Sequence, residues 1–327
     1  MWPVRNVPAG VRPLDVESLK RGSHDEKRMS RESDLDRRTY VKAVGGAGAA
    51  AALAGCLGGD GDDDTGNGDT DGTETDGTET DGTETDGTNK IVIGSDIPYK
   101  PFEYKTVEGE LVGFDVEIAE AVFAGELGIE HEFQSTAFDT IIESLNNGNF
   151  RVIMSAMTIN ETRAEEVDFS DPYFTAYQTV LVLDNGEITN KEDLRGKDVG
   201  VQKGTTGEGA AEALKEEFDG ELSIESYDQI NGAFNAMLNN QVSAVINDNT
   251  VNAEFATESD EVIFLEGEGE AAAQGENAPP YLTLTVEEYG IAFRQDDDEF
   301  RQQVNDALAA IREDGTYDEI YDEYFSG

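Results

Sequence analysis

The chain has 327 residues and a formal net charge of −48 at pH 7, from 23 lysines and arginines against 71 aspartates and glutamates. This length allows one large domain or two ordinary ones, each with its own hydrophobic core. The acidic excess excludes nucleic acid as a partner, because phosphate binding requires clustered basic residues. An acidic surface spread along the chain instead indicates adaptation to molar salt, where repulsion between charges is screened.

Histidine and cysteine are too scarce for metal chemistry. The sequence contains two histidines, His24 and His131, and one cysteine, Cys56. We therefore expect no metal site, no cofactor and no intramolecular disulfide.

Residues 1–55 have the features of an export signal. The basic pair Arg37 and Arg38 precedes a Gly/Ala-rich apolar run that ends in Leu-Ala-Gly-Cys. That run is too short to span a membrane, which takes ~20 apolar residues. The pattern resembles a twin-arginine export signal with a lipobox, in which Cys56 becomes the lipidated first residue of the mature protein. We hypothesise that Met29 is the true start, and we expect the lipid to hold the protein on the extracellular face of the membrane.

The segment 56–89 is of low complexity. It repeats Asp-Gly-Thr-Glu-Thr and has almost no apolar side chains. Such a composition cannot offset the entropy lost on ordering, so we expect a flexible, charge-extended tether. The sequence leaves open whether its threonines carry glycans.

From Lys90 onward, strand and helix patterns alternate. The order is a strand at 91–95, a helix at 114–127, a strand at 130–135, a helix at 137–148 and a strand at 152–157. The first helix is predicted from Ile118, Ala119, Val122 and Phe123 at helical spacing, with Asp115 as its N-cap. The same order returns with strands at 198–202, 222–227 and 243–248 and helices at 206–218 and 231–238. Two such units in series predict an α/β fold with two parallel-sheet lobes and a ligand site in the cleft between them.

Polar and aromatic side chains follow the predicted strands at their carboxyl ends, where parallel sheets bind ligands. These candidate site residues are Asp96, Tyr99, Phe138, Ser155, Ala156, Thr158, Gln202, Thr205, Thr206, Asn247 and Asp248. Arg163 adds a cation in a chain that has few. A cation, carboxylates, hydroxyls and helix amides together suit a zwitterionic amino acid. The competing interpretation is that Arg163 pairs on the surface with Glu165 or Glu166.

Five motifs occur along the chain in this order: "PFEY", "GELVGFDVEIAEAV", "SAMTINETRAEEVDFSDPYF", "LRGKDVGVQKGTTGE" and "REDGTYDEIYDEYF". Together they resemble the family of extracytoplasmic solute-binding proteins that deliver polar amino acids to ABC importers. The resemblance covers residues 90–327. It implies the type II periplasmic-binding-protein-like fold, in which two crossover strands form a hinge between two lobes.

The resemblance also sets the expected boundaries. Lobe 1 comprises residues 90–182 and 288–327, and lobe 2 comprises residues 183–287. The crossover strands are expected at residues 177–183 and 287–293.

The family pattern assigns a role to every candidate residue except Thr205. Arg163 binds the α-carboxylate of the ligand, and Asp248 receives its α-ammonium. The other implied contacts are Thr158, Ala156 and Thr206 for the carboxylate, Tyr99 and Phe138 for the walls, and Asp96, Ser155, Gln202 and Asn247 for the far end of the ligand. A guanidinium binds a carboxylate with two parallel hydrogen bonds, which a lysine cannot do.

The expected function is that of a monomeric, lipid-anchored receptor, not an enzyme, that closes around an amino acid and docks on an ABC permease. Asp96 beside two aromatic rings favours arginine or lysine, and Gln202 with Asn247 makes glutamine the close alternative. Two other functions stay open at this point. One is an enzyme of the same fold, similar to dehydratases, with Glu103 or Asp96 as the acid, and the other is a ligand-sensing receptor component.

Overall fold

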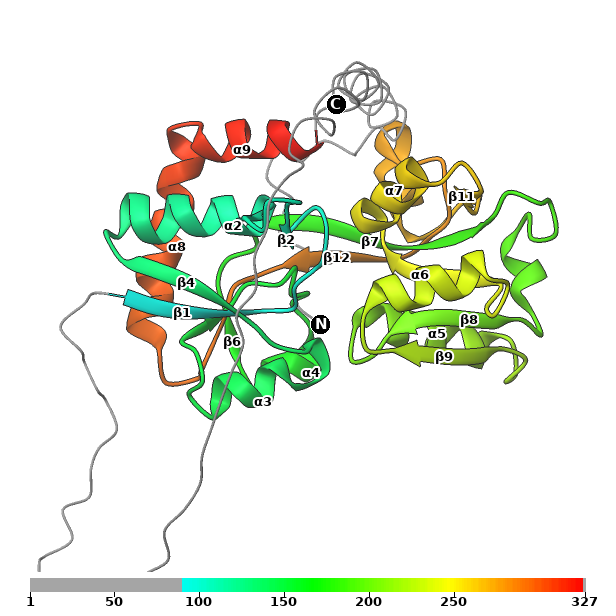
Figure 1. The fold of residues 1–327 in the computed structure, drawn as a ribbon, viewed down its shortest axis with the longest axis horizontal. Helices are drawn as coiled ribbons and strands as arrows, with labels where there is room; N and C mark the ends of the chain where they lie inside the picture. The colour runs from blue at the N-terminus through cyan, green and yellow to red at the C-terminus, as the bar shows by residue number, and fades with distance from the viewer. Residues whose placement is uncertain (1–89, 326–327) are drawn as a thin grey trace, which may run out of the picture. The chain divides into compact units, whose positions relative to one another are not determined.

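The computed structural model describes residues 90–325, without the side chains of Glu276 and Asn277. The expected export signal, Cys56 and the tether at 56–89 lie outside these residues. The described part of the chain forms two α/β lobes, each built around its own sheet (Figure 1). No helix within it combines the length and apolar character that crossing a bilayer requires.

The first lobe contains a five-stranded sheet. Its strands, in spatial order, are β4 (Glu130–Ser135), β1 (Lys90–Ser95), β5 (Val152–Ile153), β13 (Ala292–Phe293) and β6 (Asp168–Phe169). Strand β1 pairs in parallel with β4 and β5, whereas β13 is antiparallel to β5 and β6. Because β13 comes from the end of the chain, the first lobe is completed only when the chain returns from the second.

Helices and a small hairpin surround this sheet. They are β2 (Tyr104–Lys105), β3 (Leu111–Val112), α2 (Phe114–Ala119), the π-helical turn η1 (Glu120–Glu126), η2 (Phe138–Thr140), α3 (Ile141–Asn146), α4 (Glu161–Ala164), α8 (Asp298–Glu313) and α9 (Thr316–Phe325). The four apolar positions that predicted the first helix, Ile118, Ala119, Val122 and Phe123, are all fully buried. The spacing of apolar residues therefore identified the inner face correctly.

The prediction that Asp115 caps this helix is wrong. Gly113 holds the cap position, at φ 136°, where a side chain would collide with the carbonyl oxygen of Phe102. Asp115 lies fully buried inside the first turn, and its carboxylate accepts hydrogen bonds from the Ala156 amide and the Tyr173 hydroxyl, both at 2.9 Å. Its role is thus tertiary and not one of helix capping.

The second lobe contains a six-stranded sheet. Its strands are β11 (Val262–Phe264), β7 (Phe174–Leu183), β10 (Ala244–Asp248), β8 (Asp198–Gln202), β9 (Ser223–Tyr227) and, paired to β7, β12 (Thr283–Tyr289). The helices are η3 (Lys191–Leu194), α5 (Thr206–Glu217), α6 (Ile230–Leu238), α7 (Asn249–Glu258) and η4 (Glu270–Asn277). The parallel strands β8, β9 and β10 end at the first lobe, so their carboxyl ends carry side chains into the space between the lobes.

Strands β7 and β12 connect the lobes. They pair antiparallel along most of their length, from Phe174 opposite Tyr289 to Thr179 opposite Thr283, and run together between the two sheets (Figure 1). The expected first crossover, 177–183, lies inside β7, and the second, 287–293, covers the end of β12 and all of β13.

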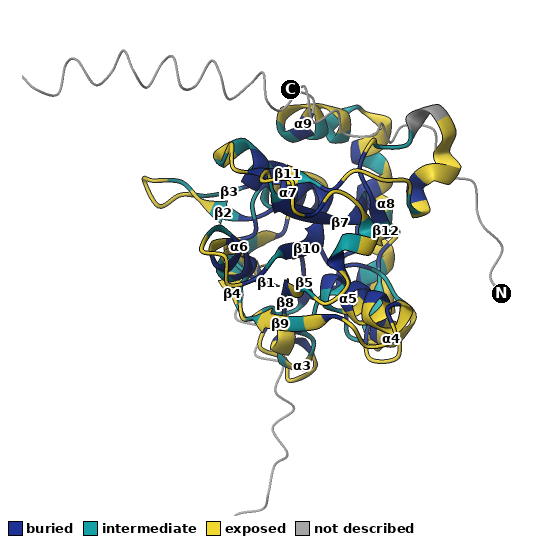
Figure 2. Ribbon diagram, turned by 90° about the vertical axis from the view of Figure 1, so that its right-hand side faces the viewer, coloured by how far each residue is buried: buried dark blue, intermediate teal, exposed yellow. Residues whose placement is uncertain are grey.

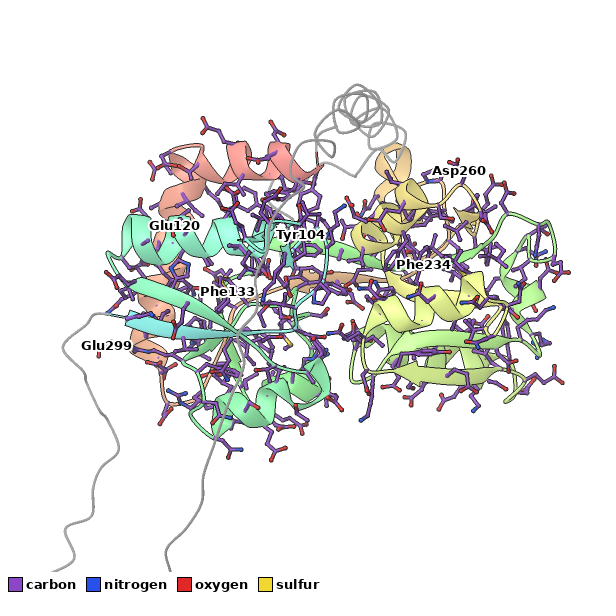
Figure 3. All side chains as sticks on the ribbon, viewed as in Figure 1. Tyr104, Glu120, Phe133, Phe234, Asp260 and Glu299 are labelled. Carbon is purple, nitrogen blue, oxygen red and sulfur yellow. The ribbon has the colours of Figure 1, made fainter. Side chains whose placement is uncertain are left out.

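Burial is highest in the central strands, and the outer helices and loops are exposed (Figure 2). The acidic side chains are mostly outside. Glu120, Asp260 and Glu299, for example, lie at the periphery of three different regions (Figure 3). The described residues contain no cluster of three or more His, Cys, Asp or Glu side chains arranged to hold a metal ion.

Candidate functional site

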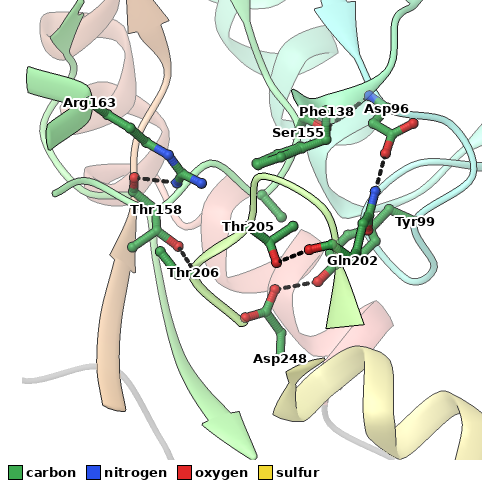
Figure 4. A pocket seen from close by; sticks show the side chains of 11 residues that line it. Asp96, Tyr99, Phe138, Ser155, Thr158, Arg163, Gln202, Thr205, Thr206 and Asp248 are labelled. Atoms are coloured by element: carbon green, nitrogen blue, oxygen red, sulfur yellow. Dashed lines mark hydrogen bonds between the residues drawn. The ribbon is translucent and has the colours of Figure 1, made fainter. Parts of the chain in front are cut away.

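A pocket lies between the two lobes, at the carboxyl ends of their strands (Figure 4). The residues that line it are Asp96, Tyr99, Phe138, Ser155, Ala156, Thr158, Arg163, Gln202, Thr205, Thr206 and Asp248. All of them were candidates from the sequence. Asn247, the remaining candidate, does not line the pocket, and its side-chain oxygen lies 3.0 Å from the oxygen of the Tyr99 hydroxyl.

Arg163 places a cation in this pocket. It lies in the short helix α4, where the side chain of Asn160 accepts a hydrogen bond from the Arg163 amide at 2.8 Å. Arg163 as a whole is 8% exposed. Its guanidinium lies 5.2 Å from the ring centre of Phe138 and donates to two carbonyl oxygens, those of Thr158 at 2.8 Å and Gly204 at 3.3 Å. Burial lowers its pKa, opposed by the charges of Glu287 and Asp248.

Arg163 forms no ion pair with any carboxylate of residues 90–325. Glu165 and Glu166, the alternative partners suggested by the sequence, are exposed while Arg163 is buried. The surface-pair interpretation is therefore wrong. A buried guanidinium without a carboxylate partner is unfavourable, so an anion that enters the pocket would find an unpaired cation there.

Asp248 places a carboxylate at the end of β10. One of its oxygens accepts from the Gln178 amide at 2.5 Å, and the other accepts a short hydrogen bond from the Tyr99 hydroxyl. Burial raises the pKa of Asp248 to about 7, and the nearby charge of Glu287 adds to the shift. A cation bound beside Asp248 would lower that pKa again.

Asp96 forms the acidic wall at the end of β1. Its oxygens accept hydrogen bonds from two amide groups of the second lobe, Gln202 at 2.5 Å and Gln229 at 3.2 Å. Burial raises the pKa of Asp96, while these two hydrogen bonds oppose the shift. Gln229 was not a candidate from the sequence, because it lies at the start of helix α6 and not directly after a strand.

Two ion pairs also cross between the lobes. Lys203 contacts Asp139 at 2.6 Å, and Lys100 contacts Glu254 at 2.7 Å. With the hydrogen bonds that Asp96 accepts and the one that Arg163 donates to Gly204, they hold the lobes against each other. The described structure is therefore a closed arrangement.

The chain matches bacterial extracellular solute-binding proteins, family 3, over residues 91–327. It belongs to this family. A probable histidine-binding protein of Neisseria gonorrhoeae is 31% identical over 236 residues, which cover 72% of this chain and 82% of that protein. The ABC transporter arginine-binding protein 1 of Escherichia coli is 30% identical over 236 residues, covering 72% of this chain and 90% of the other. A solved structure of an ancestral arginine-binding protein bound to arginine is 35% identical, with a TM-score of 0.64, and the match covers 72% of this chain and 98% of that one.

In this family 3 protein, a second layer of carboxylates supports the pocket. Ser155 donates to Glu103 at 2.7 Å and accepts from the Asp96 amide at 2.9 Å. Asp115 binds the amide of Ala156, which has a φ of 47°. That left-handed conformation is unfavourable for alanine, so the buried Asp115 holds a strained segment of the pocket in place.

Two of these supporting carboxylates, Asp115 and Glu103, have raised pKa values. Burial raises the pKa of Asp115 to about 7, and burial together with the nearby Asp115 raises the pKa of Glu103 well above its usual range. The sequence placed Glu103 in the cleft as a possible acid, but Glu103 is fully buried and is not among the residues that line the pocket.

Glu287, on β12, is the main site residue that the sequence did not identify. It is 7% exposed, and its carboxylate accepts hydrogen bonds from Thr158 at 2.7 Å and Thr206 at 2.8 Å. The sequence placed Glu287 and Glu288 together in a crossover segment. Since neighbouring residues of a strand point to opposite faces, only the pairing with β7 decides which glutamate faces the site.

Proposed function

We propose that this solute-binding protein is a receptor that captures a polar amino acid between its lobes and delivers it to an ABC importer. The observation that carries the proposal is the charge pattern of the pocket. Arg163 presents a buried guanidinium without a carboxylate partner, and Asp248 presents a buried carboxylate. The two ends of this pattern match the carboxylate and the ammonium of an α-amino acid.

The ligand class follows from the third charged group, Asp96. A side chain held between Tyr99 and Phe138 would reach this carboxylate, which favours a cationic end and hence arginine or lysine. Glutamine is the alternative, since the amides of Gln202 and Gln229 already bond Asp96 and could be shared with a neutral amide. The names of the arginine-binding and histidine-binding relatives support the cationic class.

Capture and release would use β7 and β12 as a hinge. Ligand contacts from both lobes stabilise the closed arrangement more than an open one, which lets a permease distinguish the loaded receptor from the empty one. On this proposal the receptor is a monomer held at the extracellular face of the membrane through lipidated Cys56. Replacement of Cys56 by alanine should then release the protein from the membrane fraction into the medium.

Isothermal titration calorimetry of the full-length protein in molar salt tests the proposal. The panel contains arginine, lysine, histidine, glutamine, glutamate and citrulline, which has the shape of arginine without its charge. We expect tight binding of arginine or lysine and at least about tenfold weaker binding of citrulline. Equal affinities for arginine and citrulline would favour glutamine as the ligand class. Absence of binding across the panel would refute the receptor proposal, and conversion of a bound ligand during long incubation would favour the enzyme.

A further inference from the structure

Glu287 contacts the binding site without lining it. Its Oε2 atom accepts hydrogen bonds from the hydroxyls of Thr158 at 2.7 Å and Thr206 at 2.8 Å, both of which line the pocket. Its Oε1 atom accepts from the Thr285 hydroxyl at 2.8 Å. The carboxylate is thus fixed at both oxygens.

This arrangement decides what the two pocket hydroxyls can offer to a ligand. A hydroxyl has one hydrogen and two lone pairs, and an ionised carboxylate can only accept. Thr158 and Thr206 both donate their hydroxyl hydrogens to Glu287. The Thr158 hydroxyl therefore has no hydrogen left for the ligand carboxylate, the contact that the family pattern implied, and besides Arg163 only backbone amides can make that contact here. Thr206 also accepts from the Gln178 amide at 3.2 Å, which leaves it lone-pair density but no hydrogen for the pocket.

Asp248 extends the same surface. Its two oxygens accept from Gln178 and Tyr99, and in its ionised form, the form that would receive an ammonium, it has no hydrogen to donate. Above about pH 8, where Asp248 is ionised, the side chains of Thr158, Thr206 and Asp248 therefore present hydrogen-bond acceptors to the pocket.

We propose that Glu287 is a positioning residue that fixes Thr158 and Thr206 as acceptors, so that the site selects an α-ammonium group over an α-hydroxyl or α-keto group. The inference rests on the proposed function, because it concerns the same amino-acid site. It adds the reason why the ligand must be an amino acid and not the corresponding hydroxy acid.

The selection follows from counting donors. An ammonium has three N–H donors and no lone pair, so it satisfies three acceptors at once. A hydroxyl has one hydrogen, and a keto group has none. Either analogue would leave buried acceptors unpaired and would place its own lone pairs against them, which is the arrangement that gives strong discrimination in polar sites.

The test compares amino acids with their α-hydroxy analogues by isothermal titration calorimetry of the full-length protein. The probes are L-arginine, L-lysine and L-glutamine, each with its α-hydroxy acid, and the pair whose amino acid binds wild type most tightly is used with the variants. Glu287→Met removes the acceptor at similar length. Glu287→Gln removes the charge but keeps one acceptor oxygen. Glu288→Gln is the matched control, since Glu288 is the next residue of β12 and its side chain is exposed.

We expect wild type to prefer the amino acid by at least about a hundredfold. Glu287→Met should reduce this ratio by about tenfold or more, the scale of one hydrogen bond to a charged group. Glu287→Gln should reduce it by about threefold or more, and Glu288→Gln should leave it unchanged. A merely structural role would weaken both members of the pair equally, so the ratio separates the two explanations.

The experiment separates failure of the proposed function from failure of the inference about Glu287. If wild type binds no probe, the proposed function and this inference both fall. If wild type binds an amino acid but both Glu287 variants keep its amino-to-hydroxy ratio, or wild type shows no preference, only the inference is overturned. Thermal melting identifies a variant that does not fold, and if Glu287→Met is such a variant, the Glu287→Gln ratio decides.

Discussion

Replacement of Arg163 by alanine removes the one cation that lines the pocket. In the structure, the guanidinium donates two hydrogen bonds, one to the carbonyl of Thr158 and one to that of Gly204. A guanidinium has five N–H donors, so enough remain for two parallel hydrogen bonds to a carboxylate. In the Arg163→Ala protein, the carboxylate of a bound amino acid would enter the same buried site with no cation to receive it.

The expected loss is large because the site is buried. Truncation of one partner of a buried, hydrogen-bonded charge pair costs about 2–5 kcal/mol, which is about 30-fold to several thousandfold in affinity. Part of the loss would act through closure, since Arg163 also contacts Gly204 of the second lobe at 3.3 Å. Because salt screens buried pairs much less than exposed ones, the loss should persist in molar salt.

Isothermal titration calorimetry with the tightest-binding amino acid measures this loss. The matched control is Arg301→Ala, which removes an arginine paired with Asp298 at 2.5 Å on the surface of α8. Such exposed pairs contribute about 0–1 kcal/mol to stability, and this one is not among the pocket residues, so the affinity should not change. If Arg163→Ala retains affinity within about threefold of wild type while both proteins melt cooperatively, the assignment of Arg163 as the carboxylate receptor is refuted.

Three further predictions concern the same site. The pKa of Asp248 is raised to about 7, so below that pH the empty site holds a proton that the ligand ammonium must displace. Ligand affinity should therefore fall by up to about tenfold per pH unit below about pH 6 and level off above about pH 8. An affinity that rises as the pH is lowered would contradict this prediction. Asp115→Ala leaves the Ala156 amide without its acceptor, and thermal denaturation should show a loss of about 1–3 kcal/mol, with Asp115→Asn milder because it keeps an acceptor oxygen. A Cβ at Gly204, which has a φ of 76°, would lie 2.9 Å from the backbone of the opposite lobe, so Gly204→Ala should hinder closure and weaken ligand binding. The control is Gly186→Ala, because Gly186 has a φ of 75° and open space around it, and this variant should show only the backbone strain. Equal ligand affinities of the two variants would argue against the close approach.

Much of the fold could be predicted from the sequence because its signals are local. The helical spacing of Ile118, Ala119, Val122 and Phe123 correctly identified a buried face. The order of strands and helices indicated which strand ends meet. For this reason Asp96 and Gln202, which are far apart in sequence, were expected in one cleft, and their side chains are hydrogen-bonded to each other. Parallel strands bring their carboxyl ends to one edge whatever the intervening sequence.

The supporting acids could not be predicted in the same way. Among 71 acidic residues, Glu103, Asp115 and Glu287 carry no local mark that separates them from solvated neighbours. Asp115 at the start of a helix fits the pattern of a cap. Instead, its buried carboxylate accepts hydrogen bonds from the Ala156 amide and the Tyr173 hydroxyl. Such roles depend on which segments meet in space, which is a tertiary property.

The contrast between surface and pocket indicates where selectivity must arise. Surface charge cannot select a ligand in molar salt, because screening limits its reach to about 3 Å. Around the pocket, one buried cation, Arg163, stands against the carboxyls of Asp96 and Asp248, with Glu287 directly behind Thr158 and Thr206. On the proposed function, such a set is best complemented by a ligand with one carboxylate and two cationic groups, as in arginine and lysine. The raised pKa of Asp248 lets a proton neutralise this carboxyl group when the pocket is empty. On the proposed function, that proton leaves as the ligand ammonium binds, so the negative charge of Asp248 is balanced both before and after binding.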